Sequence, residues 1–261
     1  HAAAEQARER GGSVLGIFVE ETNLLRSAGY GFAREVGGSS GVARPLESAH
    51  LEARIASMAE LAQRTLARTM AAQGIDQRLM RCRGQVVQEV LNLATADDLL
   101  ILGRVGWSAG PGRSLGSTAR SLLHEAPGDV LLWTDSRPRP GKRIVVLLNH
   151  HQGANHRAIE LGVALARRHH SPLTILLRPD HTAADSQARD AQASELLRQL
   201  QVHQVPARVR SLASGDINTL SRTLRDEAAS HLVLSRGSSL FLQRETDELL
   251  LSLNLPVTIT R

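Results

Sequence analysis

The strongest constraint on the fold is an alternation of strand-like and helix-like segments that runs through the chain twice. Before the Pro- and Gly-rich stretch TDSRPRPGKR, the segments at 13–20, 77–84, 97–103 and 129–134 are typical of strands, with helical patterns between them. After that stretch, five more strand-like segments run from RIVVLLN to PVTITR. Strands this apolar, alternating with helices, indicate parallel sheets covered on both faces. The sequence predicts an α/β fold of two tandem, doubly wound, Rossmann-like domains, each designed around a five-stranded parallel sheet.

The correspondence between the two halves sets the predicted domain limits. Residues 78–103 correspond in sequence pattern to residues 207–237, because each segment contains a strand, a helix and an apolar strand in the same order. We expect domain 1 at 1–135, a linker at 136–142 and domain 2 at 143–261. The first half opens on HAAAEQARERGG, which is typical of a helix end, so its first and central strand is missing from the printed sequence. We favour a preceding segment as its source over another chain.

Composition excludes several classes of function. Basic residues number 31 against 26 acidic residues, and Lys142 is the only lysine. A P-loop needs a lysine after its second glycine, and a Schiff-base enzyme would depend on Lys142 in the linker. With 2% aromatic residues and no basic run, we expect no nucleic-acid partner. No apolar run approaches the roughly 18 residues of a membrane span, so we expect no membrane partner. The single Cys82 favours a reducing, cytoplasmic location.

A glycine-rich loop after the apolar segment 99–102 is the best candidate for a binding site. In open α/β sheets, ligands bind beyond the carboxyl ends of strands, where glycine lets backbone N–H groups approach a phosphate. The loop starts at Gly103 and ends at Gly116, where a helix begins. The positive helix N-terminus, its hydroxyl and amide donors and two nearby arginines suit the phosphates of a nucleotide. The candidate residues are Gly103, Arg104, Gly106, Arg113, Gly116, Ser117 and Thr118.

The spacing of these residues resembles a known motif. Glycines also occur in loops that need only flexibility, but Gly103, two residues, Gly106, nine residues and then Gly116-Ser117 reproduce G-x2-G-x9-G-S/T. That motif is the one of the universal stress protein family, which the chain resembles over almost its whole length. The resemblance implies that the motif and its neighbours bind the ribose and phosphates of ATP, or of ADP or AMP, with Mg²⁺ as a candidate companion. The family's adenine-binding Asp, at the end of the first strand, has no counterpart that we can place in the first half.

The second half departs from this motif. Its first strand ends in Asn149 where the family's Asp would fall, and Ser235 stands in place of the first glycine. Glu245, Asp247 and Glu248 put negative charge at the start of the last helix, which favours helix capping and disfavours phosphate. We interpret this half as a degenerate scaffold or pairing partner.

Histidines and serines suggest no other site. His150, His151 and His156 follow a strand, but no Cys or carboxylate joins them at metal-ligand spacing, so we expect solvated or capping histidines. Ser117 and His124 stand seven residues apart on one predicted helix, about 10 Å along its axis. That separation excludes a nucleophile and its base.

Two further features lie at the carboxyl edge of the first visible strand. Glu20 and Glu21 follow that strand, either as exposed loop carboxylates or as ligands for Mg²⁺ near phosphates. The long loop at 22–45 mixes apolar residues with glycine, so we expect a lid or an interaction surface there.

These features predict a cytoplasmic universal stress protein that binds an adenine nucleotide through domain 1 and acts as a stress-response regulatory module. No catalytic set is visible, so we expect no enzyme, with at most weak ATP hydrolysis. The resemblance implies pairing through fifth strands; we expect DVLLWT and PVTITR to pair within the chain and two chains to form a homodimer. Two alternatives stay open, a nucleotide-free interaction scaffold and an enzyme of the related adenine-nucleotide hydrolase-like fold. Copurifying nucleotide would argue against the scaffold, and turnover of bound ATP would support the enzyme.

Overall fold

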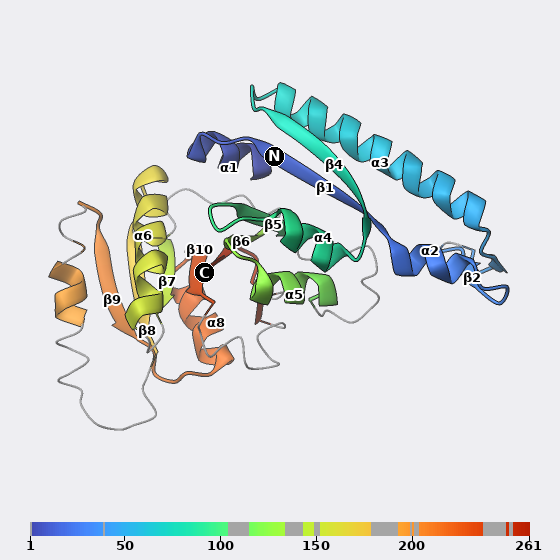
Figure 1. Ribbon diagram of the computed structural model, residues 1–261. Helices are drawn as coiled ribbons and strands as arrows, with labels where there is room; N and C mark the ends of the chain where they lie inside the picture. The colour runs from blue at the N-terminus through green and yellow to red at the C-terminus, as the bar shows by residue number, and fades with distance from the viewer. Residues whose placement is uncertain are drawn as a thin grey trace. The chain divides into compact units, whose positions relative to one another are not determined.

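The computed structural model in Figure 1 divides into two compact units, His1–Leu93 (unit 1) and Ala94–Arg261 (unit 2). The backbone of residues 152–154 is described without their side chains. The residues that the structure describes are 2–38, 40–103, 115–133, 143–148, 152–178, 193–198, 200, 204–236, 249–250 and 253–261.

Unit 1 is built on a two-stranded parallel sheet. Strand β1 (Val14–Glu21) pairs with β4 (Gln77–Gly84) along its whole length, from Val14 opposite Gln77 to Glu21 opposite Gly84. The predicted loop at 22–45 contains a helix and an antiparallel hairpin, so most of it is regular structure. The remaining elements of unit 1 are α1 (Ala2–Arg10), α2 (Thr22–Ala28), β2 (Arg34–Val36), β3 (Ala43–Pro45), α3 (Ser48–Ala71) and α4 (Val86–Leu93).

Helix α3 follows the spacing of its apolar residues. Leu51, Ile55 and Ala59 stand four residues apart, so they lie on one face of the helix, and all three are buried. Leu51 and Ile55 form a small core with Ala28 of α2, and Phe18 of β1 packs against it. This core fastens α2 to the start of α3 and to the end of β1.

Unit 2 contains a seven-stranded sheet. Its strand order is β5-β6-β11-β10-β7-β8-β9, and every neighbouring pair is parallel except β6 and β11. The order of the last five strands is that of a doubly wound sheet, with β7, the first strand of the second half, at the centre. The elements are β5 (Leu99–Gly103), α5 (Ser117–Glu125), β6 (Asp129–Trp133), β7 (Arg143–Leu148), α6 (Gln152–Arg168), β8 (Leu173–Leu177), β9 (Ala207–Ser211), α8 (Ile217–Asp226), β10 (Ala229–Ser235) and β11 (Val257–Thr260).

The core of unit 2 is formed where α6 packs on the central strands. A Cβ at Gly162 of α6 would lie 2.3 Å from Cγ2 of Val146 in β7, so only glycine allows this close approach. Strands β7, β8 and β10 are buried along nearly all of their residues, as expected for parallel strands covered on both faces.

The antiparallel ladder of β6 and β11 joins residues 94–133 to the C-terminal strands. Val130 lies opposite Ile259 and Leu132 lies opposite Val257. The buried carboxylate of Asp129, at the start of β6, accepts hydrogen bonds from Arg157 of α6 at 2.9 and 3.0 Å. The predicted pairing of DVLLWT with PVTITR within the chain is therefore confirmed.

The division into units differs from the predicted domain limits. The predicted linker at 136–142 lies outside the described residues. The boundary between the two units falls between Leu93 and Ala94 in the sequence. The four strands assigned to domain 1 fall into two sheets, because β1 and β4 pair with each other while β5 and β6 join the sheet of unit 2. A single doubly wound sheet would need a further strand between β1 and β5. No helix in the described part of the chain is long and apolar enough to cross a membrane.

The buried His231 of β10 makes the stability of unit 2 depend on pH. Burial lowers the pKa of His231 to about 3, and its Nε2 lies 2.8 Å from the Thr258 hydroxyl. The unfolded chain has a His pKa near 6.5, so it binds a proton between about pH 6.5 and pH 3 that the native state does not bind. We expect the free energy of unfolding to fall by about 2 kcal/mol between pH 7 and pH 5 from this group.

The measurement is urea unfolding followed by tryptophan fluorescence, since both tryptophans, Trp107 and Trp133, belong to unit 2. His231→Gln should remove most of this pH dependence. The exposed His170 is the matched control, and His170→Asn should keep it because Asn tolerates the left-handed backbone there (φ 48°). An unchanged pH dependence in His231→Gln would contradict the assignment.

Candidate functional site

The carboxyl end of β5 and the start of α5 carry the described part of the predicted glycine loop. Gly103 ends β5 opposite Trp133 of β6, and Gly116 is the residue before α5. Among the residues that the structure describes, a Cβ at either glycine would meet no atom within 4 Å. Three other predicted residues, Arg104, Gly106 and Arg113, lie outside the described residues.

The N-terminus of α5 has the properties of an anion site. Gly116 occupies the N-cap position with φ −56° and ψ 146°, and it has no side chain to accept from the N–H groups of the first turn. Ser117 and Thr118, the first helical residues, are exposed, and the first turn has no acidic residue. An exposed helix N-terminus with hydroxyl-bearing residues and no acidic residue in its first turn is a favourable environment for an anion.

Packing on both sides holds this helix in position. Leu115 just before α5 and Leu122 and Leu123 within it are buried. After the helix, a Cβ at Gly128 would lie 2.3 Å from the carbonyl oxygen of Asp98, so the turn before β6 presses against the turn before β5. The start of α5 is thus an exposed end of a firmly packed helix.

The corresponding edge of the second half is differently built. Ser235, at the end of β10, is buried, and its hydroxyl has no hydrogen-bond partner in the part of the chain that the structure describes. The next residue, Arg236, donates to the carbonyl oxygen of Gly128 at 2.7 Å and to that of Ala126. This arginine is used to attach the second half to the turn before β6. The remaining predictions for this half, on Asn149, Glu245, Asp247 and Glu248, lie outside the described residues.

Comparison with known proteins decides the family. A model of the universal stress protein family matches residues 1–133, a range that ends at the last residue of β6. The chain belongs to the universal stress protein family. The family resemblance inferred from the glycine spacing is therefore confirmed at the level of the family. No curated protein is close enough in sequence to count as a relative.

Solved universal stress proteins share the fold. One from Archaeoglobus fulgidus DSM 4304 has a TM-score of 0.66 at 16% identity, covering 81% of this chain and 79% of the other. A putative universal stress protein from Pseudomonas aeruginosa UCBPP-PA14 has a TM-score of 0.55 at 15% identity, covering 94% and 92%. A functionally unknown protein from Pseudomonas aeruginosa PAO1 has 0.55 at 19% identity, covering 77% of each chain. At these identities the likeness concerns the fold alone.

The two glutamates considered for Mg²⁺ both have protein partners in this universal stress protein. Glu20 accepts from Arg81 at 2.6 Å and from Arg83 at 2.9 Å, and these hydrogen bonds hold the pKa of Glu20 below its usual value. Glu21 accepts from the backbone N–H of Val86 at 3.4 Å, at the start of α4. Glu20 is thus held by two arginines, whereas Glu21 accepts a single long hydrogen bond.

The histidines form no metal site among the described residues, where no group of three potential ligands comes together. His156 lies on α6 and pairs with Glu160 one helical turn away, at 3.3 Å, with both side chains mostly exposed. His150 and His151 lie outside the described residues. His169 and His170 follow the end of α6, and both side chains are exposed.

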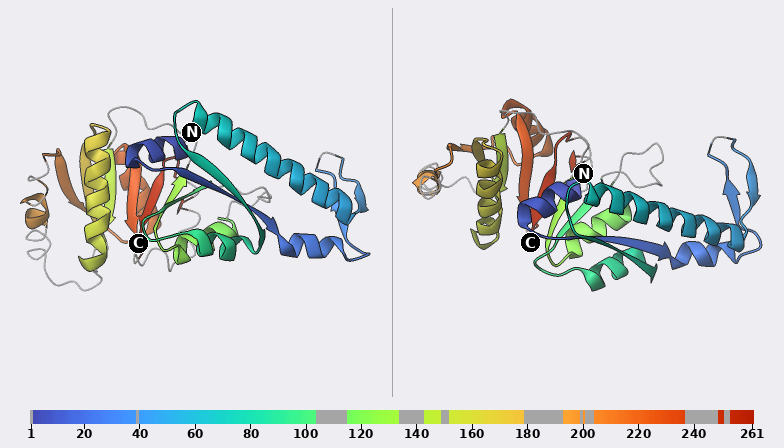
Figure 2. Two further views of the ribbon diagram at one scale, coloured as in Figure 1. Left: turned by 45° about the horizontal axis from the view of Figure 1, so that its top comes forward. Right: turned by 90° about the horizontal axis from the view of Figure 1, so that it is seen from above.

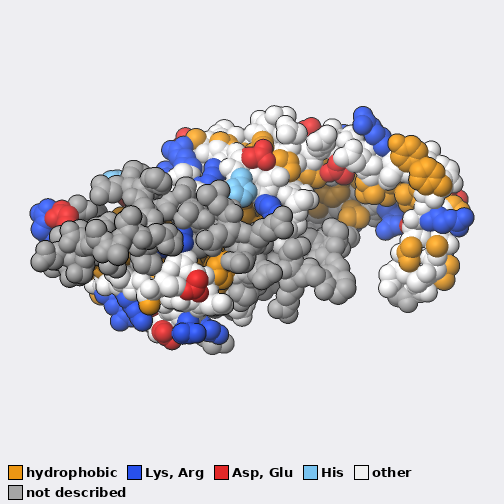
Figure 3. All heavy atoms as spheres, turned by 90° about the horizontal axis from the view of Figure 1, so that it is seen from below, with side chains coloured by type: hydrophobic (Ala, Val, Ile, Leu, Met, Phe, Trp, Pro, Cys, Tyr) orange, Lys and Arg blue, Asp and Glu red, His pale blue; other side chains and the backbone are white. Residues whose placement is uncertain are grey.

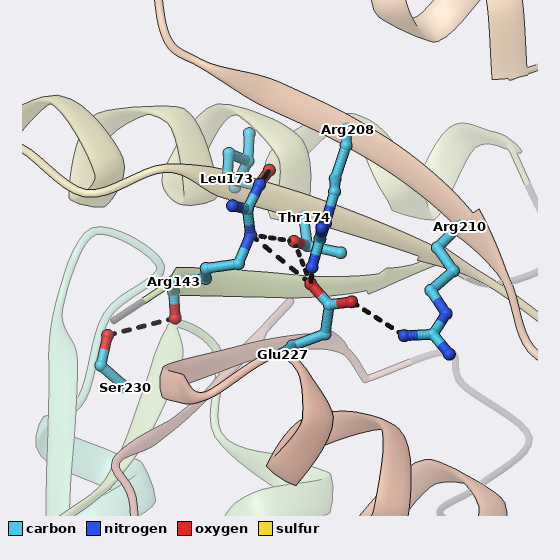
Figure 4. Close-up of polar contacts among 7 residues, drawn as sticks. All are labelled: Arg143, Leu173, Thr174, Arg208, Arg210, Glu227 and Ser230. Carbon is cyan, nitrogen blue, oxygen red and sulfur yellow. Dashed lines mark hydrogen bonds and ion pairs between the residues drawn. The ribbon is translucent and has the colours of Figure 1, made fainter. Parts of the chain in front are cut away.

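A polar cluster that the sequence did not indicate lies at the amino ends of β7, β8 and β9 (Figure 4). The side chain of Glu227 is completely buried, and it accepts from Thr174 at 2.7 Å, from Arg208 at 3.0 Å and from Arg210 at 3.0 Å. Arg143 lies 3.5 Å from the same carboxylate and donates to Thr174 at 2.7 Å. One glutamate therefore joins three strands to the end of α8.

This cluster is structural rather than a ligand site. Burial alone would raise the pKa of Glu227, but the hydrogen bonds from Arg208, Thr174 and Arg210 outweigh it and hold the pKa below its usual value. The three arginines converge on a carboxylate that already supplies the anion they need. No local pattern in the sequence signals the cluster, because Glu227 follows Arg210 by 17 residues.

Replacing this carboxylate tests its structural role. Glu227→Gln removes the negative charge but leaves Arg143, Arg208 and Arg210 in place, so we expect a loss of about 3 kcal/mol in the free energy of unfolding. Urea unfolding monitored by tryptophan fluorescence gives this value for unit 2. The control is Glu195→Gln, which removes an exposed pair with Arg198 (2.7 Å) and should cost less than about 1 kcal/mol. Equal losses in the two variants would refute the role.

Proposed function

We propose that this universal stress protein binds an adenine nucleotide, ATP, ADP or AMP, at the glycine loop between Gly103 and Ser117. The observation that carries this proposal is the start of α5, where Gly116 leaves the first-turn N–H groups without a side-chain acceptor. Backbone donors, two hydroxyl groups and a positive helix end suit a phosphate chain. In this proposal Ser117 and Thr118 contact the phosphates, and Arg104 and Arg113 add charge-assisted hydrogen bonds.

The proposal includes a tandem organisation. Strands β7 to β11 supply a complete five-stranded order in the second half, and β1, β4, β5 and β6 take the places of strands two to five in the first. In a doubly wound sheet of this kind, the first strand lies between the second and the fourth. The second half then acts as the scaffold that holds β6 through β11.

The proposed activity is binding and regulation in the stress response rather than catalysis. We assign no catalytic residue, and any hydrolysis of bound ATP is slow and incidental. In this proposal Mg²⁺ enters with the nucleotide and is held by its phosphates, since Glu20 is already engaged by Arg81 and Arg83. We further propose a cytoplasmic location and a homodimer; because β6 and β11 pair with each other, that dimer would use other surfaces.

Two substitutions of Gly116 separate binding from folding. Asp is a favourable N-cap residue, so Gly116→Asp should keep or slightly raise the melting temperature. Its carboxylate would stand where the phosphates bind, and a like charge there should weaken ATP binding by about a hundredfold or more. Gly116→Ala is the matched control, because a Cβ at this position meets no atom of the described residues within 4 Å.

The experiment is to denature each purified protein, identify the released nucleotide, and titrate ATP while following the melting temperature. We expect adenine nucleotide from the wild type and from Gly116→Ala, and none from Gly116→Asp. Added ATP should raise the melting temperature of the first two only. Empty wild-type protein that ATP does not stabilise would overturn the proposal and favour the interaction scaffold.

A further inference from the structure

Residues 22–47 of unit 1, which contain α2, β2 and β3, form a projecting segment that we call the arm. Its inner side is held by the small core in which Ala28 packs with Leu51 and Ile55, and Leu25 and Leu46 pack against them. The hairpin of β2 and β3 projects at the N-terminal end of α3 within unit 1 (Figure 2). The arm is thus a fastened, convex projection.

The outer side of the arm is unusually apolar. Phe32 is 81% exposed, and its ring stacks on that of Tyr30 with centroids 5.4 Å apart. These two rings are a third of the chain's six aromatic residues, which makes their exposure notable in so aromatic-poor a protein. Val36 and Val42, on either side of the hairpin turn, are also more than half exposed. The exposed large apolar residues of the arm are Leu24, Tyr30, Phe32, Val36 and Val42.

The arm carries positively charged side chains that have no acidic partner in the described part of the chain. Arg26, Arg34 and Arg44 are exposed, and none of them forms an ion pair in the described part of the chain. Of the two glutamates of the arm, Glu35 pairs with Arg54 at 2.7 Å. Glu47 lies 3.4 Å from His50, which neutralises it only when the imidazole is protonated. Figure 3 shows apolar side chains gathered on the hairpin with basic side chains beside them.

The hairpin register places an apolar residue pair and a basic residue on one side. Val36 lies opposite Ala43, and two residues along, Arg34 lies opposite Pro45. Side chains two residues apart on a strand point to the same face. This face therefore combines an apolar surface with a cation, on strands too short to form a groove.

We propose that the arm docks on the surface of an anionic lipid bilayer, with Phe32 and Val36 in the headgroup region. Arg34 and its neighbours would then contact lipid phosphates. A second copy of the chain fits less well, since two arms would bring unpaired arginines together. A protein partner would need a concave surface complementary to the convex tip of the arm, whereas the headgroup region of a bilayer can accommodate such a tip. The expectation of no membrane partner rested on the absence of a spanning segment, which surface docking does not need.

The test is co-sedimentation of the intact protein with vesicles of phosphatidylcholine alone and of phosphatidylcholine with 30% phosphatidylserine. We expect binding to the anionic vesicles only, with release in 0.5 M salt. Phe32→Ser should lower the bound-to-free ratio by about tenfold or more. Arg34→Gln should lower it by roughly fivefold.

Two control variants carry comparable substitutions of exposed side chains outside the arm. Leu61 of α3 is 60% exposed, so Leu61→Ser matches Phe32→Ser, and the exposed Arg78 of β4 matches Arg34 through Arg78→Gln. Both controls should bind as the wild type does. All four side chains are exposed, and circular dichroism melting verifies that each variant is folded.

Absence of wild-type binding, equal binding to neutral vesicles, or equal loss in the controls would each overturn the proposal. A wild-type dimer that Phe32→Ser converts to a monomer, without vesicle binding, would assign the arm to a second copy. None of these outcomes depends on nucleotide, so the result is independent of the function proposed for the glycine loop.

Discussion

The antiparallel pairing of β6 with β11 is the constraint on which unit 2 depends. Each parallel group of strands would otherwise end in an exposed edge, and such edges invite pairing with other chains. Here the two edges cover each other, and side-chain contacts extend the ladder. Asp129 accepts two hydrogen bonds from Arg157 and one from the backbone N–H of Arg261. Seven strands thereby share one sheet, and the turn that supports α5 becomes part of the same packed body.

The same pairing determines at which end of the strands, carboxyl or amino, each site lies. Because β6 and β11 run in opposite directions, the carboxyl end of β5, with Gly103, lies at the edge where β7 to β11 have their amino ends. The carboxyl edge of the second half, with Ser235, is the opposite one. The two halves therefore cannot share a ligand at their carboxyl edges. The arginines around Glu227 stand on the glycine-loop edge, but at the far strands β7 to β9, where they serve that carboxylate.

Local patterns in the sequence were sufficient for the elements but not for their partners. The apolar segments at 97–103 and 129–134 appear as β5 and β6. The four-residue spacing of Leu51 and Ile55 is that of one helix face, and both residues lie in α3. Which edge β6 meets depends on long-range contacts that no local window contains. The hairpin was missed because β2 and β3 have only three residues each, too few to show alternation. The partners of Glu227 lie up to 84 residues away, Arg143 being the most distant, and so left no local signal.

The starts of α5 and α8 in unit 2 distinguish a structural cap from a candidate binding site. At α8, Asp216 accepts from the N–H of Thr219 at 2.8 Å, so the chain satisfies its own helix end. At α5, Gly116 offers no acceptor, although a side-chain cap there would add a few tenths of a kcal/mol to the stability. The helix is firmly packed by Leu122 and Leu123, so it does not need that contribution. The first-turn donors of α5 have no side-chain cap in the described part of the chain, which is consistent with a role in binding. The charge at position 116, and not its volume, is therefore the decisive variable.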